Sequence, residues 1–308
     1  LALELFRYQA ANNPIYREYL KLLGFSTGKV SSISSIPFLP ISFFKSHTLK
    51  TGQWNSKVVF SSSGTTGQQP SQHHLRDINF YLDNSKKGFE FFYGPVKDYC
   101  TLALLPSYLE RGGSSLVAMA DFFIQQSRYT QSGFFLDNQK ALIQILRDCK
   151  LKNIPTLLLG VSFALLDLAE QYPIDLSSTI IMENGGMKGR RKEITRMELH
   201  DQLKKTFKVE TIHSEYGMTE LLSQAYSKGE GLFFPSHTMK VITREITDPF
   251  AIQKSGKTGA VNIIDLANID SIAFIATDDL GRVYTDGSFE ILGRLDNSDV
   301  RGCNLMVI

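Results

Sequence analysis

A short loop rich in glycine and hydroxyl side chains has the clearest chemical meaning in this sequence. It follows the apolar residues Val58–Phe60, which are typical of a buried strand. Glycines let the backbone approach a ligand and turn successive N–H groups into one concavity, while hydroxyls rotate toward phosphate oxygens. A flexible Ser/Gly loop is the plainer alternative, but we predict an anion-binding loop. Its candidate residues are Ser62, Ser63, Gly64, Thr65, Thr66 and Gly67.

This loop resembles the phosphate-binding loop of the adenylate-forming superfamily, which includes acyl-CoA ligases, luciferases and nonribosomal adenylation domains. The resemblance implies an enzyme that uses ATP and Mg²⁺ to convert a carboxylic acid into an acyl-adenylate, with release of pyrophosphate. A kinase-type loop is the weaker interpretation. The Gly-Lys-Thr of residues 256–258 has Ala251 where a kinase-type loop has its first glycine.

A second motif, Tyr216–Glu220, resembles the central motif of the same superfamily. The resemblance implies that the Tyr216 ring stacks on adenine, next to Gly217. It also implies that Thr219 contacts phosphate and that Glu220 helps to hold Mg²⁺. A carboxylate oxygen suits this last role, because Mg²⁺ prefers oxygen ligands and is commonly shared with phosphates.

Residues 184–187 follow an expected strand and resemble the glycine pair that lines the adenine pocket in the superfamily. By themselves, two glycines after a strand indicate only a turn, so this match adds little on its own. The candidate adenine-binding residues in this motif are Gly185, Gly186 and Met187.

Two further motifs lie near the end of the chain. Residues 277–282 resemble the superfamily's Thr-Gly-Asp-Leu-Gly segment, in which the aspartate binds both ribose hydroxyls. Asp279 is the matching residue, but Asp278 replaces the usual glycine, so which aspartate acts stays open. Residues 293–296 match the Gly-Arg-x-Asp hinge motif. This match implies that Arg294 contacts ribose or phosphate and that Asp296 marks the pivot to a mobile C-terminal domain.

Two differences from the superfamily pattern point to one family within the superfamily. The lysine that ends the superfamily's phosphate loop is replaced within residues 68–74, and the chain stops at Ile308, just past the hinge motif. The mobile C-terminal domain and its lysine are therefore expected to be absent. The remaining motifs together resemble the acyl-protein synthetase (LuxE) family, which moves a fatty acyl group from AMP to its own cysteine and then to a reductase partner. These motifs are Tyr8-Gln9, Asn12–Pro14, Ile36–Pro40, Leu105–Glu110 and Val300–Asn304.

Cys303 matches the acyl-accepting cysteine of that family. A thiolate attacks a mixed anhydride readily, and the nearby Arg301 favours the thiolate form. A buried structural cysteine is an alternative of equal weight.

The histidines carry less information. His73 and His74 either contact phosphate in place of the missing lysine or cap the helix expected after them. His213, which precedes Glu215 and Tyr216, is a candidate for the acyl pocket.

The motifs together predict ATP-dependent activation of a carboxylic acid, a fatty acid by resemblance, followed by acyl transfer to a thiol. Cys303 and then an acyl-reductase partner are the acceptors that the resemblance implies. Two alternatives stay open: an acyl-CoA or aryl-CoA ligase that uses CoA, and a nucleotide-binding protein that has lost catalysis.

The bulk composition adds few constraints. Of 308 residues, 43% are hydrophobic and 21% charged, which is ordinary for a folded soluble protein, and a net charge of +2 does not favour nucleic acid as a partner. Three cysteines without a CxxC pair suit a cytoplasmic location. The longest apolar stretch, residues 156–169, is too short and too polar to span a membrane.

The elements that must position these motifs alternate between short apolar strands and longer amphipathic helices. This alternation predicts an α/β, layered αβα core over residues 1–232, with a sheet buried on both faces. Strands without a clear helix predict a smaller β-rich subdomain over residues 233–308. The expected helices are residues 3–23 (divided at Pro14), 75–92, 138–149, 163–170 and 191–207, and the expected strands are residues 58–60, 101–105, 156–159, 179–182, 239–246, 259–265, 271–276 and 289–292.

Overall fold

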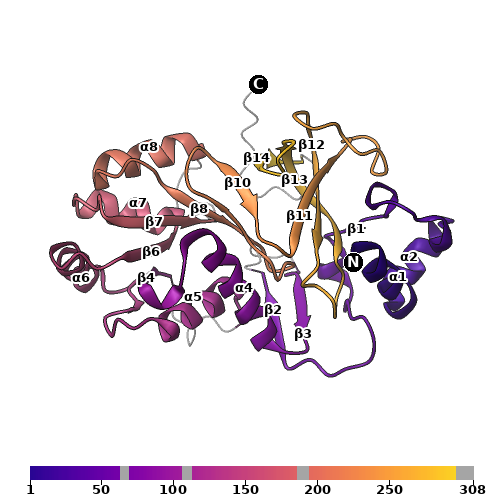
Figure 1. The fold of residues 1–308 in the computed structure, drawn as a ribbon, viewed down its shortest axis with the longest axis horizontal. Coiled ribbons are helices and arrows are strands. Elements are labelled where there is room, and N and C mark those ends of the chain that lie inside the picture. The colour runs from indigo at the N-terminus through magenta and orange to yellow at the C-terminus, as the bar shows by residue number, and fades with distance from the viewer. Residues whose placement is uncertain (63–68, 106–112, 186–193, 296–308) are drawn as a thin grey trace. The chain divides into compact units, whose positions relative to one another are not determined.

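A computed structural model describes residues 1–62, 69–105, 113–185 and 194–295 of the chain (Figure 1). The described chain divides into two compact units, each assembled from segments that are distant in sequence. The first unit contains Leu1–Ser85, Gly217–Gln224 and the described residues from Phe234 onward. The second unit contains Lys86–Tyr216 and Ala225–Phe233.

The second unit is an α/β structure built on a mixed sheet. Its elements are β4 (Cys100–Leu104), α5 (Ser115–Gln126), β5 (Gly133–Phe134), α6 (Gln139–Leu151), β6 (Thr156–Val161), α7 (Ser162–Gln171), β7 (Thr179–Asn184), α8 (Arg196–Phe207), β8 (His213–Tyr216) and β9 (Ala225–Ser227). The strand order is β5-β4-β6-β7-β8-β9, parallel except for the last pair. Figure 1 shows α7 and α8 together on one side of these strands and α5 on the other, which is the predicted αβα layering.

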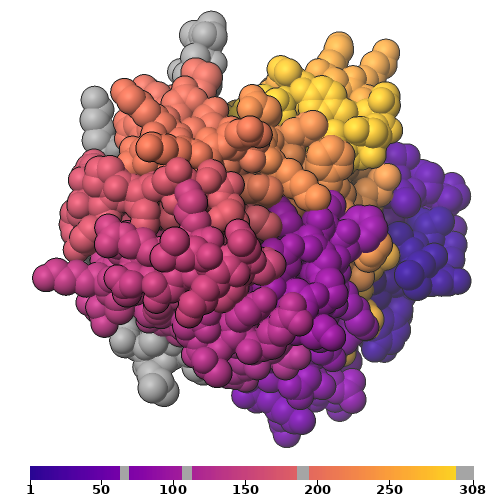
Figure 2. All heavy atoms as spheres, turned by 60° about the vertical axis from the view of Figure 1, so that its left-hand side comes forward, coloured from indigo at the N-terminus to yellow at the C-terminus, as the bar shows by residue number. Residues whose placement is uncertain are grey.

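Burial and helix caps explain why these residues form these elements. Every residue of β4 and β6 is buried, as expected for parallel strands covered on both faces. Thr195 and Glu198 form a reciprocal capping box that fixes the start of α8. Gly160 in β6 allows α7 to pack closely, because a Cβ there would lie 2.9 Å from Cγ of Leu165. Figure 2 shows the surface of this unit mainly in magenta to salmon.

The first unit is dominated by antiparallel strands. Its longer elements are α1 (Ala2–Asn12), α2 (Pro14–Leu22), β11 (Met239–Arg244), β12 (Thr258–Asp265), β13 (Phe274–Val283) and β14 (Phe289–Arg294). β11 to β14 pair in sequence order, and the short β1 (Leu39–Pro40) runs parallel to β13. A separate hairpin, β2 (Val58–Ser61) and β3 (Gln72–Leu75), precedes α4 (Ile78–Tyr93), which starts in this unit and continues into the second.

The N-terminal helices pack on this antiparallel sheet. Pro14 is the first residue of α2, and the Asn13 side chain accepts the Tyr16 amide, so the predicted division at Pro14 is confirmed. The Phe6 ring packs edge-on against Phe274, with centroids 6.1 Å apart. Figure 1 shows both helices beside the strands of this unit.

The α/β fold class is confirmed, while several boundaries differ. The helix expected from residue 75 begins at Ile78, because Leu75 still belongs to β3. α5 was not predicted, because its apolar positions do not follow one clear face. The last strands are longer than expected: β13 continues through its polar residues Asp278 and Asp279 to Val283.

Candidate functional site

The base of the predicted phosphate loop is closed by a pair of hydrogen bonds between Ser62 and Ser71. The Ser62 amide donates to the Ser71 carbonyl at 3.0 Å, and the Ser71 amide donates to the Ser62 hydroxyl at 2.9 Å. The loop therefore leaves β2 and returns to β3 at adjacent positions. The other predicted loop residues, Ser63, Gly64, Thr65, Thr66 and Gly67, lie outside the described residues.

Glu220 lies next to this base. Its side chain accepts a hydrogen bond from the Ser71 side chain, and the residue is 7% exposed. Burial raises the pKa of the Glu220 carboxyl, the Ser71 hydrogen bond and the charge of Arg294 oppose this rise, and the charge of Asp279 adds to it. The predicted metal ligand Glu220 and the motif residues Asp279 and Arg294 therefore lie close enough for their charges to interact.

Asp279 and Arg294 face each other on neighbouring strands. They are paired residues of β13 and β14, and Nε of Arg294 lies 3.5 Å from Oδ1 of Asp279. This ion pair is only partly screened, since the side chains are 13% and 34% exposed. Nε of Arg294 is buried and makes no hydrogen bond within the described chain, so its interaction with Asp279 is an ion pair without a hydrogen bond.

Asp278 has a different environment from Asp279. The buried Arg244 guanidinium donates to the Val261 and Thr277 carbonyls, both at 2.9 Å. Burial lowers the pKa of Arg244, and the charge of Asp278 is the first influence that opposes this. Asp278 thus interacts with Arg244, whereas Asp279 interacts with Arg294 and Glu220.

The second unit carries the predicted adenine-binding residues that the structure describes. Asn184 on β7 and Glu215 on β8 are paired residues, and the Asn184 amide donates to the Glu215 carboxyl. Gly185 and Tyr216 directly follow this pair at the same edge of the sheet. The Gly185 carbonyl accepts the Ser162 hydroxyl. Gly186 and Met187 lie outside the described residues.

Two buried carboxyl groups support this edge of the sheet. Burial raises the pKa of Glu215 to about 8, and the negative charge of Glu183 adds to the effect. Burial also opposes ionisation of Glu183, but His200, Arg196 and the Ser214 hydroxyl hold its pKa below the ordinary value. Neutral Glu215 and ionised Glu183 are therefore the forms that this arrangement favours at neutral pH.

The histidines take roles that the sequence did not reveal. His73 lies in β3 with 1% exposure and bonds to the Thr219 carbonyl and the Ser271 hydroxyl, so it neither caps α4 nor has a free ring nitrogen for phosphate. The Asn79 amide in the first turn of α4 instead donates to the Asp77 carboxyl. In the second unit, His213 bonds to the Tyr93 hydroxyl at 3.1 Å.

The cysteines divide into two groups. Cys100 and Cys149 are buried free thiols, as their apolar surroundings predicted. Cys303 and Arg301 lie outside the described residues, so the predicted acyl acceptor remains a prediction from the sequence.

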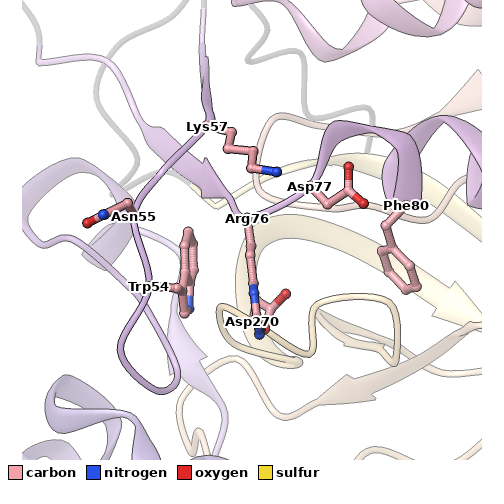
Figure 3. A pocket seen from close by; sticks show the side chains of 7 residues that line it. All are labelled: Trp54, Asn55, Lys57, Arg76, Asp77, Phe80 and Asp270. Atoms are coloured by element: carbon pink, nitrogen blue, oxygen red, sulfur yellow. The ribbon is translucent and has the colours of Figure 1, made fainter.

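A hollow of about 520 Å³ opens on the first unit (Figure 3). Arg76 and Asp270 face each other in it at 3.7 Å. A second, smaller hollow shares Arg76 and Asp270 with it and is also lined by His73 and Ser271. Because none of the predicted residues lines the larger hollow, we place the candidate chemistry at Glu220 instead. The hollow is lined by Trp54, Asn55, Lys57, Arg76, Asp77, Phe80 and Asp270.

The residues around Glu220 fit a divalent cation that is shared with a ligand. Among the described residues, no group of three or more His, Cys, Asp or Glu side chains is arranged to hold a metal by itself. Mg²⁺ is commonly bound by one or two carboxylates together with substrate phosphates. A cation beside Glu220 would favour the ionised carboxylate, which burial alone disfavours.

Several solved structures of larger ligases have a similar fold. An open conformation of 2-hydroxyisobutyryl-CoA ligase, in complex with 2-HIB-AMP and CoA, matches 99% of this chain and 76% of its own, with a TM-score of 0.69 at 14% identity. ATP-bound MatB from Rhodopseudomonas palustris matches 79% of this chain and 49% of its own, with a TM-score of 0.59 at 15% identity. O-succinylbenzoate Coenzyme A synthetase (MenE) from Bacillus subtilis, in complex with ATP and magnesium ion, matches 80% and 52%, with a TM-score of 0.55 at 18% identity.

These matches show that the chain shares the fold of these ligases. The chain spans about half the length of the MatB and MenE chains. No family model and no curated protein matches the sequence. Within the described residues, no helix is both long and apolar enough to cross a membrane.

Proposed function

We propose that this protein uses ATP to activate a carboxylic acid as an acyl-adenylate, with release of pyrophosphate. The main support is the arrangement of Glu220, Asp279 and Arg294, which act on one another beside the Ser62–Ser71 base of the predicted phosphate loop. A cation ligand, a ribose acceptor and a positive charge next to a phosphate loop are the groups that such a reaction needs. The fold shared with ATP-bound MatB is consistent with this chemistry.

In the proposed site, each group has one task. The loop donors hold the phosphates, Asp279 accepts the ribose hydroxyls, and Arg294 neutralises charge near the α-phosphate. Mg²⁺, when bound at Glu220, supplies charge neutralisation to the phosphates that leave. The other residues that we assign to nucleotide binding are Ser62, Ser63, Gly64, Thr65, Thr66, Gly67, Gly185, Gly186, Met187, Tyr216, Gly217 and Thr219.

The first step needs no side-chain nucleophile. A carboxylate oxygen of the substrate attacks the α-phosphorus in line, the bond to the bridging oxygen breaks, and pyrophosphate leaves. The protein contributes by orienting the two reactants and by neutralising charge with fixed donors. In the second step a thiolate attacks the acyl carbon and AMP leaves with the electron pair of the broken C–O bond. We propose Cys303 as the source of this thiolate, a fatty acid as the substrate and an acyl-reductase protein as the final acceptor.

Pyrophosphate–ATP exchange over a panel of carboxylic acids tests the first step. We expect exchange with at least one medium- or long-chain fatty acid. Glu220→Gln should lower its rate by about 100-fold or more, because the amide cannot replace a carboxylate at Mg²⁺. Tight ATP or AMP binding without exchange for any acid would instead identify a nucleotide-binding protein without catalysis.

Radioactive fatty acid and ATP test the second step. We expect label on the protein that neutral hydroxylamine removes and that is lost in Cys303→Ser, while Cys149→Ser keeps it. The similar folds include CoA ligases, so a CoA-dependent thioester is the second candidate function. Product formation that requires CoA and survives Cys303→Ser would select that alternative.

A further inference from the structure

Two buried side chains bond to consecutive carbonyl groups of the central motif in the first unit. Nδ1 of His73 lies 2.9 Å from the Thr219 carbonyl, and Nδ2 of Asn268 donates to the Glu220 carbonyl at 2.9 Å. Both residues are almost completely buried, with exposures of 1% and 0%. They come from β3 and from the loop between β12 and β13, so distant parts of the chain meet on one dipeptide.

The segment that carries this dipeptide lacks the backbone ladder of a helix or strand. Residues 217–224 contain a turn, closed by the Leu221 amide on the Met218 carbonyl at 3.1 Å. From the other side, the Asp265 carboxyl accepts the Leu222 and Ser223 amides at 2.8 and 2.9 Å. Since buried backbone groups need partners, side chains hold this segment in place where secondary structure does not.

The ring of His73 is fixed in one tautomer. A carbonyl oxygen only accepts, so Nδ1 carries the hydrogen that bonds to Thr219, and Nε2 accepts the Ser271 hydroxyl at 2.8 Å. The Phe44 ring packs edge-on against the imidazole, with centroids 5.3 Å apart. Both polar atoms of the ring are therefore used inside the protein.

The loop between β12 and β13 is in turn hydrogen-bonded to the N-terminal helices. The Ser271 carbonyl accepts the Asn13 side chain at 3.0 Å. Gln9 donates to the Asn268 carbonyl at 2.8 Å and accepts the Ala273 amide at 3.0 Å. The loop that holds Asn268 and Ser271 is thus attached to α1 and α2, which gives two of the N-terminal polar residues a physical role.

We infer that His73 and Asn268 are positioning residues that hold the backbone of Thr219 and Glu220 in the geometry needed for Mg²⁺ and phosphate. This inference rests on the proposed adenylation. His73 acts through the Thr219 carbonyl and touches no substrate. Displacement of a reacting group by about 1 Å can cost about 100-fold in rate, so loss of this bond should reduce catalysis more than nucleotide affinity.

Two substitutions of His73 separate its two hydrogen bonds. Asparagine places an N–H donor near the Nδ1 position, toward Thr219, whereas glutamine reaches the Nε2 position, toward Ser271. We expect His73→Gln to lower kcat of pyrophosphate–ATP exchange about 10- to 100-fold and to raise the Mg²⁺ requirement, while His73→Asn stays within about fivefold of wild type. His47→Asn is the matched control, because His47 lies at the surface and bonds to the neighbouring Ser46 instead.

Amide hydrogen exchange provides a readout that does not depend on activity. In His73→Gln, the amides of residues 218–223 should exchange about tenfold faster or more, with the rest of the first unit unchanged. Wild-type exchange rates in these amides, or equal kcat for His73→Gln and His73→Asn, would overturn the inference. If the glutamine variant does not fold, Asn268→Ala replaces it, because it removes the donor to the Glu220 carbonyl, and the amides of residues 218–223 should again exchange faster than in the wild type. Absence of pyrophosphate–ATP exchange in the wild type would reject the adenylation proposal, whereas hydrogen exchange would still decide the positioning role.

Discussion

The two adjacent aspartates near the end of the chain differ in the cation that each one faces. Asp279 forms an ion pair with Arg294, and its charge raises the pKa of Glu220. The charge of Asp278 instead raises the pKa of the buried Arg244. We therefore expect Asp279→Asn to raise KM for ATP at least about tenfold in pyrophosphate–ATP exchange, because an amide accepts the ribose hydroxyls less strongly than a carboxylate does. Asp278→Asn should leave this KM within about threefold and cost about 1 kcal/mol of unfolding free energy, because Arg244 loses a charged neighbour.

Deoxynucleotides provide the control for this assignment. Wild type and Asp278→Asn should discriminate ATP from 2′-deoxy-ATP, and Asp279→Asn should have lost most of that discrimination. A KM defect that is confined to Asp278→Asn would contradict the assignment and would make Asp278 the ribose ligand.

Glu215 should make the stability of the protein depend on pH. Its pKa is about 8 in the folded protein against an ordinary value of 4.5, so the folded state binds a proton that the unfolded state has lost in this range. The free energy of unfolding should consequently fall as pH rises from about 4.5 to about 8, by at most about 5 kcal/mol. Urea unfolding at pH 5, 6.5 and 8 measures this. Glu215→Gln, which keeps a neutral side chain of the same shape, should show a flatter dependence; identical slopes would contradict the prediction.

At the scale of the elements, β13 and β14 approach too closely for any side chain at Gly281. A Cβ there would lie 2.5 Å from the Glu290 carbonyl oxygen and 2.8 Å from Cγ2 of Val261. Gly281→Ala should therefore destabilise the protein by about 2–4 kcal/mol, because the strands must separate next to Asp279. Gly28→Ala is the matched control, since a Cβ at Gly28 meets no atom within 4 Å, and we expect a change within about 0.5 kcal/mol. Thermal and urea unfolding measure both; similar losses in the two variants would contradict the argument.

The elements that the sequence predicted well are those whose side chains follow one simple pattern. β4 and β6 are continuous apolar runs because both faces are covered, and Pro14 can only start a helix or interrupt one. β3 was missed because Gln72, His73 and His74 look like a polar loop, although His73 is buried. A neutral buried histidine is recognised only once its partners are known.

For the candidate site too, some residues were predicted from the sequence and others were not. The resemblance of three motifs to the adenylate-forming superfamily predicted roles for Glu220, Asp279 and Arg294, and the charges of these residues interact in the structure. Ser71, Asn268 and Arg244 were not predicted, because their roles depend on partners far away in the sequence, such as Glu220 for Ser71. Only the position of Ser71, where the loop returns to a strand, was a signal that sequence reasoning had available.

On the scale of the whole molecule, the residues that we propose for nucleotide binding are divided between the sequence segments of the two units. The metal, ribose and phosphate residues that the structure describes belong to the first unit, and Gly185 and Tyr216 belong to the second. Tyr216 ends one unit's segment and Gly217 begins the other's, so the central motif itself crosses the boundary. We expect a chain cut between Tyr216 and Gly217 to lose pyrophosphate–ATP exchange, because the cut separates residues of one motif.

Two intrinsic probes can show whether the units unfold together. Trp54 is the sole tryptophan of the chain and lies in the first unit, whereas Cys100 and Cys149 are buried thiols of the second. The chain passes repeatedly between the units, and α4 is one continuous helix with residues in both. We therefore expect Trp54 emission and pulse labelling of thiols in Cys303→Ser to follow the same urea transition. Midpoints that differ by more than about 0.5 M would show instead that one unit stays folded without the other. In that case nucleotide binding could be assigned to each unit separately by adding ATP or AMP and observing which midpoint shifts.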